Sequence, residues 1–274
     1  MVLGLGSILG TVALFYGDFI VAHKVGILIA WLTSSILFHF LVWNKSNNIE
    51  EIKLKINGCN IEIIKGDIFE NRLDYNGKKP LKVFSFNEYF DTYMDENDTI
   101  IAANTLNGRF INEILKGQVK DLDKKIKNDI NLCKNKLEIN ENRKLGKKQK
   151  YRLGSMIKYN KDYLLTAFSY FDEQNEAHMT LESYINFLMQ FWLNVNSLYA
   201  QRSIELPIIG SGITRFNNDG NNVSSQELLE HIIWTFKISR LKFASDTVIR
   251  IVVWENSTDI INLYRIREMY KNEL

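Results

Sequence analysis

The sequence predicts a three-layer α/β domain that follows a hairpin of two membrane-spanning helices. Two charge-free apolar runs fill most of the first 43 residues, and strands and helices alternate through the rest of the 274-residue chain. Small or polar residues also stand at the ends of several predicted strands. Alternating strands and helices are typical of a sheet covered by helices on both faces. We therefore divide the chain into a helical hairpin, residues 1–44, and an α/β domain, residues 45–274.

The composition is that of a globular protein with an apolar N-terminus. Its formal net charge is only +2, so bulk electrostatics give no reason to expect a nucleic-acid partner. The two cysteines, Cys59 and Cys133, are far apart and belong to no Cys-x-x-Cys pair. We therefore expect two free thiols in a reducing compartment and no metal site.

The apolar runs are Val2–Tyr16 and Val25–Trp43, and a polar break at Gly17–Lys24 separates them. The second run has nineteen residues without Asp, Glu, Lys or Arg, close to the length that crosses a hydrocarbon core. A signal peptide would need a basic leading segment and a cleavage site, which are lacking. A buried helical hairpin of a soluble core is the other alternative. Lysines after the second run favour the cytoplasmic side for the rest of the chain: Lys45, Lys53 and Lys55.

The α/β domain begins with a predicted β-hairpin. Residues alternate between apolar and polar over Ile52–Ile56, an Asn57-Gly58 turn follows, and Ile61–Ile64 forms the second strand. Further strands are expected at Val83–Phe86, Thr99–Asn104, Met156–Tyr159, Asp162–Phe168, Leu206–Ile209 and Val248–Trp254. The last of these is a β-branched run of the kind buried on both faces of a sheet.

Helices are predicted between these strands. One begins at Phe110 and merges with a charged amphipathic helix over Gln118–Cys133. A second is capped by Thr180 and carries an aromatic stripe that we assign to the core. The pattern Ser224-Ser225-Gln226-Glu227 forms a capping box before Leu228–Leu241, and a terminal helix covers Asp259–Tyr270. The basic run Arg143–Lys150 is expected to be a solvated loop, with contact to anionic lipid or RNA as the alternative.

The stretch Leu206–Arg215 is a candidate binding loop. Gly210 and Gly212 lack Cβ atoms, so the backbone there can approach a ligand and point N–H groups at a phosphate. Arg215 would add a charge-assisted contact. The alternative is an ordinary turn between a strand and a loop.

Three strand ends carry a resemblance to a known family. Gly66-Asp67-Ile68, Ala102-Ala103-Asn104 and Pro207-x-x-Gly210-x-Gly212-Ile213 follow one another in the order found in macro domains, which bind ADP-ribose and its relatives. The resemblance covers roughly residues 50–274. It implies a three-layer α/β/α fold with a mixed central sheet.

The resemblance also implies roles for individual residues. Asp67 would accept a hydrogen bond from the adenine amine, Gly210–Ile213 would bind the diphosphate, and Asn104 would contact the distal ribose. Trp254 or Phe216 would stack on adenine, and Asn256 would lie beside the adenosine. The alternatives are that Asp67 closes a turn, Asn104 caps a loop and Trp254 packs in the core. The expected ligand-binding residues are Asp67, Ile68, Ala103, Asn104, Leu106, Asn107, Gly108, Arg109, Gly210, Ser211, Gly212, Ile213, Thr214, Arg215, Phe216, Trp254 and Asn256.

The chain departs from hydrolytic macro domains after the asparagine. Those domains follow it with a glycine-rich run, whereas Thr105–Phe110 contains a single glycine. The nearest carboxylate that could act as a base is Glu113, one turn into the following helix. We therefore expect no catalytic residues and binding without turnover. A membrane-tethered ADP-ribosyl hydrolase is the alternative.

Two N-terminal membrane helices before such a domain resemble the membrane effector of type II Thoeris anti-phage defence. That resemblance implies an effector in the bacterial inner membrane with its macro domain in the cytoplasm. A partner TIR-domain enzyme would supply the signal, an ADP-ribose-type nucleotide such as histidine-ADP-ribose. Binding would make the effector form homo-oligomers and disrupt the lipid bilayer. No further cofactor, no metal and no nucleic acid is expected.

Overall fold

The computed structural model describes residues 17–47, 49–94, 100–216, 223–254 and 261–271. The chain divides into two compact units, Met1–Ile49 and Glu50–Leu274.

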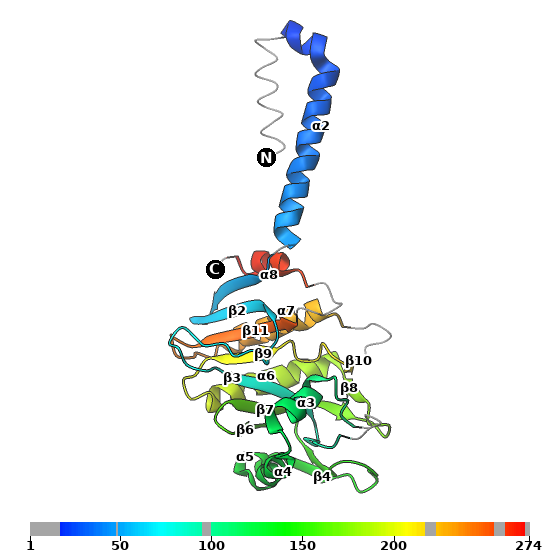
Figure 1. Ribbon diagram of the computed structural model, residues 1–274, viewed down its shortest axis with the longest axis vertical. Coiled ribbons are helices and arrows are strands. Elements are labelled where there is room, and N and C mark those ends of the chain that lie inside the picture. Colours follow the sequence, from blue (N-terminus) through cyan, green and yellow to red (C-terminus); the bar gives the residue numbers. More distant parts are fainter. Residues whose placement is uncertain (1–16, 48, 95–99, 217–222, 255–260, 272–274) are drawn as a thin grey trace. The chain divides into compact units, whose positions relative to one another are not determined.

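The N-terminal unit contains helix α2, Gly17–Asn47 (Figure 1). Its segment Ala22–Val42 is long and apolar enough to cross a membrane, with a mean hydropathy of 2.1. Within the part of the chain that the structure describes, this segment is not buried. The expected turn at Gly17–Lys24 is helical instead, with a kink at His23, where φ is −112° and ψ is 15°. The other expected span, Val2–Tyr16, lies outside the described residues, so the two-helix hairpin stays a prediction.

The second unit is built on a mixed sheet. Among the described residues, nine strands join in the order β1-β2-β11-β9-β3-β7-β8-β10, and β6 pairs with β7. Neighbours among β2, β11, β9, β3 and β7 are parallel, whereas β1, β6 and β8 run antiparallel to a neighbour. The strands are β1 Glu51–Ile56, β2 Cys59–Gly66, β3 Leu81–Asn87, β6 Met156–Tyr159, β7 Tyr163–Phe171, β8 Ala177–Met179, β9 Ile204–Pro207, β10 Arg215–Phe216 and β11 Val248–Trp254.

The first hairpin forms as its turn sequence predicts. Asn57 and Gly58 have φ values of 54° and 79°, and Asn-Gly tolerates two successive positive φ angles in a tight turn. The alternate residues Ile52, Leu54 and Ile56 of β1 are buried, and the residues between them are exposed. This pattern is typical of a strand with one solvated face. Strand β11 is buried along almost its whole length between β2 and β9, as predicted.

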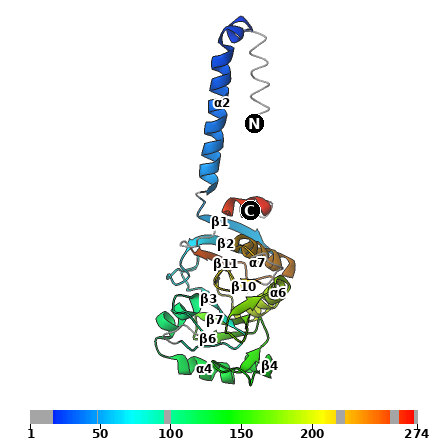
Figure 2. The ribbon, with the colours of Figure 1, turned by 90° about the vertical axis from the view of Figure 1, so that its right-hand side faces the viewer.

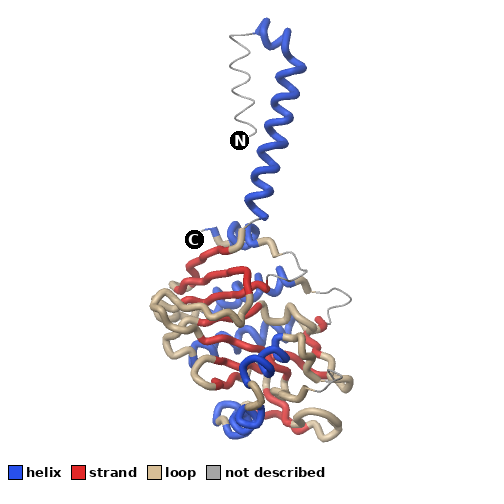
Figure 3. Tube along the Cα trace, viewed as in Figure 1, coloured by secondary structure: helices blue, strands red, loops and turns tan. Residues whose placement is uncertain are grey.

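Helices cover both faces of the sheet, which gives the expected three layers (Figures 1 and 2). On one face, Phe168 of β7 contacts Phe187 of α6, Leu181–Leu198, with ring centroids 5.0 Å apart. On the other face, the ring centroid of Phe84 of β3 lies 4.7 Å from that of Phe110 of the π-helix η1, Phe110–Leu115. The strands therefore lie between two apolar helix layers, and Figure 3 shows them as a continuous set of red segments.

Two helices, α6 and α7, are capped as predicted. Thr180 Oγ1 accepts a hydrogen bond from Ser183 N at 3.1 Å, and the aromatic stripe of α6 is buried. Helix α7, Ser225–Ser239, begins with the predicted capping box between Ser224 and Glu227. The terminal helix α8, Leu263–Met269, is shorter than predicted because Asn262 caps it through Arg265 N.

The predicted strand Thr99–Asn104 is wrong in its described part. Residues 100–104 form bends and turns, and Ile100 and Ile101 are buried in the core without pairing to another strand. Two isoleucines form too short an apolar run to distinguish a strand from a buried loop. The following helix begins earlier than predicted: α3, Leu106–Arg109, is capped by Thr105 and leads directly into η1.

The predicted amphipathic helix is interrupted. Lys116 adopts a φ of 47° and ends η1, and a second break at Asp129 divides α4, Val119–Asn128, from α5, Ile130–Lys134. Asp129 Oδ1 accepts hydrogen bonds from Asn131 N and Leu132 N, so its side chain starts a new helix. A short antiparallel pair then follows, β4 Lys136–Ile139 with β5 Gln149–Tyr151, which the sequence did not predict.

The basic run Arg143–Lys150 is only partly solvated, which corrects the expectation of a solvated loop. Arg143 is buried and its Nη2 lies 2.7 Å from Oδ2 of the fully buried Asp91. Its guanidinium also lies 3.9 Å from the ring centroid of Tyr89. Lys147 forms an ion pair with Asp123 at 2.5 Å. Arg143 is drawn into the domain because the buried carboxylate of Asp91 needs a cationic partner.

Candidate functional site

Three parallel strands bring the predicted site residues to one edge of the sheet. Trp254, the last residue of β11, pairs with Gly66, the last residue of β2, and Asp67 follows directly. On the other side of β11, Val252 pairs with Pro207, the last residue of β9. The carboxyl ends of parallel strands are the usual place for ligands in α/β sheets. The Gly66-Asp67-Ile68 segment and the Gly210 loop therefore begin on either side of Trp254.

Asp67 is a well-connected carboxylate. Oδ1 accepts a hydrogen bond from Phe69 N at 3.0 Å, and Oδ2 accepts one from Nη2 of Arg109 at 2.8 Å. Partial burial raises the pKa of Asp67, but the hydrogen bonds and the positive charges of Arg109 and Arg72 outweigh it and lower the pKa below its usual value. The neighbouring Ile68 is buried in the core, so only its backbone remains close to the site.

Arg109 extends from the end of α3 to Asp67. Its Nε donates to Oε1 of Glu113 at 2.8 Å, so one guanidinium joins two carboxylates. The same guanidinium lies 4.1 Å from the ring centroid of Phe69 and 5.3 Å from that of Trp254. Trp254 remains 41% exposed. Sequence reasoning missed Phe69, although its position directly after Gly66-Asp67-Ile68 was an available signal.

Gly108 fixes the loop that carries Ala103 and Asn104. A Cβ atom at residue 108 would lie 2.2 Å from the carbonyl oxygen of Ala102, so only glycine fits. Thr105 Oγ1 accepts a hydrogen bond from Gly108 N at 3.1 Å and closes the same turn. Ala103 and Asn104 are exposed, and Leu106 and Asn107 are half-buried. The Ala-Ala-Asn motif thus lies in a turn packed against α3.

The Gly210 loop is anchored at one end and open at the other. Gly210 has a φ of 95°, and a Cβ there would lie 3.1 Å from the rings of Phe168 and Phe216. A Cβ at Gly212 would meet nothing within 4 Å, and Ile213 is 66% exposed. Within the part of the chain that the structure describes, the backbone N–H groups of Gly212, Ile213 and Thr214 donate no hydrogen bond. These donors are available to an anion.

The last two residues of the predicted loop are engaged in the fold. Arg215 Nη2 lies 2.8 Å from Oε1 of Glu176. Phe216 is 8% exposed and its ring meets that of Tyr184 edge to face, at 5.6 Å between centroids. Of the two predicted stacking residues, Trp254 is therefore the more accessible. Asn256 lies outside the described residues.

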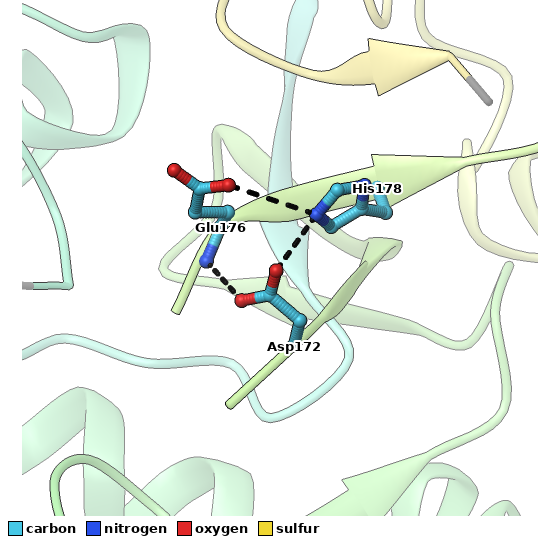
Figure 4. A group of neighbouring side chains, drawn as sticks. All are labelled: Asp172, Glu176 and His178. Carbon is cyan, nitrogen blue, oxygen red and sulfur yellow. Dashed lines mark hydrogen bonds and ion pairs between the residues drawn. The ribbon is translucent and has the colours of Figure 1, made fainter. Parts of the chain in front are cut away.

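A cluster that the sequence did not reveal lies at the β7–β8 turn, where Asp172, Glu176 and His178 gather (Figure 4). Their potential ligand atoms lie within 4.8 Å of one another, and the donor types suit a metal such as zinc. Asp172 accepts the backbone N–H of Glu176 at 2.8 Å and lies 2.8 Å from Nε2 of His178. Glu176 is also paired with Arg215. These contacts close the turn and link β8 to β10.

Comparison with known proteins gives one family and several relatives. Residues 61–254 match the family described as Thoeris protein ThsA, Macro domain. The chain is 40% identical over 232 residues to the Thoeris protein ThsA of Bacillus amyloliquefaciens (strain Y2), a match that covers 82% of this chain and 73% of that protein. Among solved structures, a mutant macrodomain of Oceanobacillus iheyensis is 14% identical with a TM-score of 0.49, covering 82% of this chain and 99% of that one. Another mutant of it, solved with ADPR, is 14% identical with a TM-score of 0.44, covering 82% and 100%.

Proposed function

The chain belongs to the Thoeris ThsA macro-domain family of anti-phage defence, and from this premise we propose that it senses an ADP-ribose-derived signal at the carboxyl edge of its sheet. The observation that carries the proposal is the pairing of two features at that edge. A carboxylate, Asp67, is suited to an adenine amine, and free N–H groups in the Gly210 loop are suited to a diphosphate. A nucleotide diphosphate needs both kinds of contact.

We propose further that the ligand is bound and not hydrolysed. Glu113, the first carboxylate after the distal-ribose loop in the sequence, is already paired with Arg109 at 2.8 Å. A general base must reach the proton that it abstracts, and Oε1 of Glu113 is directed at the guanidinium of Arg109 instead. The loop that would close over the distal ribose also has a single glycine, Gly108, and this glycine is packed against Ala102.

The membrane part of the proposal rests on α2. Its Ala22–Val42 segment would anchor the chain in the bacterial inner membrane with the macro domain in the cytoplasm. By the type II resemblance, a TIR enzyme would supply histidine-ADP-ribose, and binding would drive homo-oligomers that disrupt the bilayer. A ligand can shift this assembly equilibrium only if it binds the assembled state more tightly.

Calorimetric titration of the full chain in detergent micelles tests the binding step. ADP-ribose and histidine-ADP-ribose are titrated into the wild type, Asp67→Ala and Asn104→Ala. Each variant truncates a partly or fully exposed side chain that is expected to contact the ligand. We therefore expect the variant to fold but to lose affinity for the ligand. Light scattering during the titration follows the oligomer size, and released free ADP-ribose from a modified substrate would indicate hydrolysis.

Asp162→Ala is a matched control for Asp67→Ala. Asp162 forms an ion pair of 2.7 Å with Arg202, close in length to the Asp67–Arg109 pair, but it precedes β7 and therefore lies at the amino end of a parallel strand. Its removal should leave affinity unchanged. Wild-type affinity in both Asp67→Ala and Asn104→Ala would contradict the location of the site.

A further inference from the structure

Arg109 fills the place at Asp67 that a nucleotide base would need. Its Nη2 donates to Asp67 Oδ2 at 2.8 Å, which is the acceptor proposed for the adenine amine. Asp67 Oδ1 is used by Phe69 N. Both carboxylate oxygens of Asp67 therefore already have a donor, and a base amine at Oδ2 must either share that oxygen with the guanidinium or displace it.

The guanidinium also imitates the chemistry of the base. It is planar, it donates N–H groups from its edge, and it lies against aromatic rings, 4.1 Å from the centroid of Phe69 and 5.3 Å from that of Trp254. Aromatic faces with a carboxylate at the edge suit either a guanidinium or an aminopurine. The two groups therefore compete for the same contacts.

The backbone of Arg109 is fixed, whereas its side chain is partly exposed to water. Gly108 packs against Ala102 and Ala103, so the end of α3 cannot shift freely. The Arg109 side chain is 22% exposed, its partner Asp67 is 30% exposed, and both can exchange with water. Glu113, one turn further on in η1, holds Nε at 2.8 Å and can keep the guanidinium after it leaves Asp67.

We propose that Arg109 is a latch, meaning a side chain that occupies the base-recognition contacts of the empty site and moves aside onto Glu113 when an adenine nucleotide binds. This inference rests on the proposed function, because the competing group is the adenine of the sensed nucleotide. The latch lowers the affinity for the nucleotide, since binding must first break the Arg109–Asp67 pair. It therefore sets the signal concentration at which the protein responds.

Removal of the latch should tighten binding. Calorimetric titration of ADP-ribose into the full chain in detergent compares the wild type with Arg109→Gln. The variant no longer has to break an exposed ion pair and a cation–π contact before the nucleotide binds. Their loss corresponds to a decrease in Kd of about threefold to thirtyfold. Arg265→Gln is the control. Arg265 lies in helix α8, and its Nε lies 2.9 Å from Oε1 of Glu230 in helix α7. This variant also loses an arginine ion pair and should bind as the wild type does.

The outcomes separate the latch from the binding site itself. If Arg109 contacts the ligand instead, Arg109→Gln will bind more weakly than the wild type, and equal or weaker binding overturns the latch. If neither protein binds ADP-ribose or histidine-ADP-ribose, the proposed function fails and the latch with it. Binding by Arg109→Gln alone supports a latch that the probe cannot displace. Should that variant not fold, Arg109→Lys keeps the positive charge but cannot pair with Asp67 and Glu113 at once, and binding no tighter than the wild type then overturns the proposal.

Discussion

Substitution of Arg143 by glutamine should destabilise the macro domain strongly, because it leaves the buried Asp91 carboxylate without its cation. Arg143 donates Nη2 to Asp91 at 2.7 Å and to Asn175 Oδ1 at 2.9 Å, and Nη1 to the carbonyl oxygen of Lys147 at 2.6 Å. The Asp91 side chain is fully buried and the Arg143 side chain is 5% exposed. Water therefore cannot replace the lost partner.

The expected loss follows from this burial. Removal of one partner of a buried ion pair costs about 3–5 kcal/mol of unfolding free energy. In a domain of this size, each kcal/mol lowers the melting temperature by about 2–4 °C, so the total decrease should be about 6–20 °C. Scanning calorimetry or near-UV circular dichroism of the full chain in detergent measures the domain transition.

Lys144→Gln is the matched control for Arg143→Gln. It removes a positive charge from the next residue of the same basic run, where the side chain is exposed, and should change the melting temperature little. If Arg143→Gln melts within about 2 °C of the wild type, a domain of this size has lost at most about 1 kcal/mol, which would contradict a strong stabilisation by the buried pair. Equal losses in the two variants would instead point to the total charge of the run.

Other consequences concern the site and the thiols. In chemical denaturation, Gly108→Ala should lower the unfolding free energy by about 1–3 kcal/mol, because the new Cβ would lie 2.2 Å from the Ala102 carbonyl oxygen. Gly212→Ala should be neutral in the same measurement, because a Cβ there would have no atom within 4 Å. Cys59 is buried and its pKa is raised to about 12 by burial, so a maleimide should label only the exposed Cys133 in the native protein and both thiols after denaturation. The pKa of Asp67 is lowered on folding, so its ion pair stabilises the fold at any pH above about 5. This part of the stability is lost as the pH falls below about 4, through the pKa of the folded state. Acid titration of Asp67→Asn should lack that component, and an identical acid transition in the wild type and the variant would contradict it.

Local signals in the sequence were sufficient for several elements and for the family. The Asn57-Gly58 turn, the Thr180 cap and the Ser224 capping box each depend on a few neighbouring residues, and all three form as predicted. Apolar periodicity likewise located the buried stripe of α6 and the buried strand β11. The strand-end motifs identified the family because they combine residue type with order along the chain.

Tertiary contacts decided what local pattern could not. Ile100 and Ile101 look like part of a strand, but no strand among the described residues pairs with them, and they pack into the core from a bend. Arg143 looks like one of many solvated cations, and only the fold brings Asp91, distant in sequence, against it. The same reason explains Arg109. Its charge and its place after Asn104 were visible in the sequence, but its pairing with Asp67 across 42 residues depends on how β2 and α3 meet. Charge pairing between distant residues has no local signature, so only the tertiary structure revealed that the predicted base contact is already occupied.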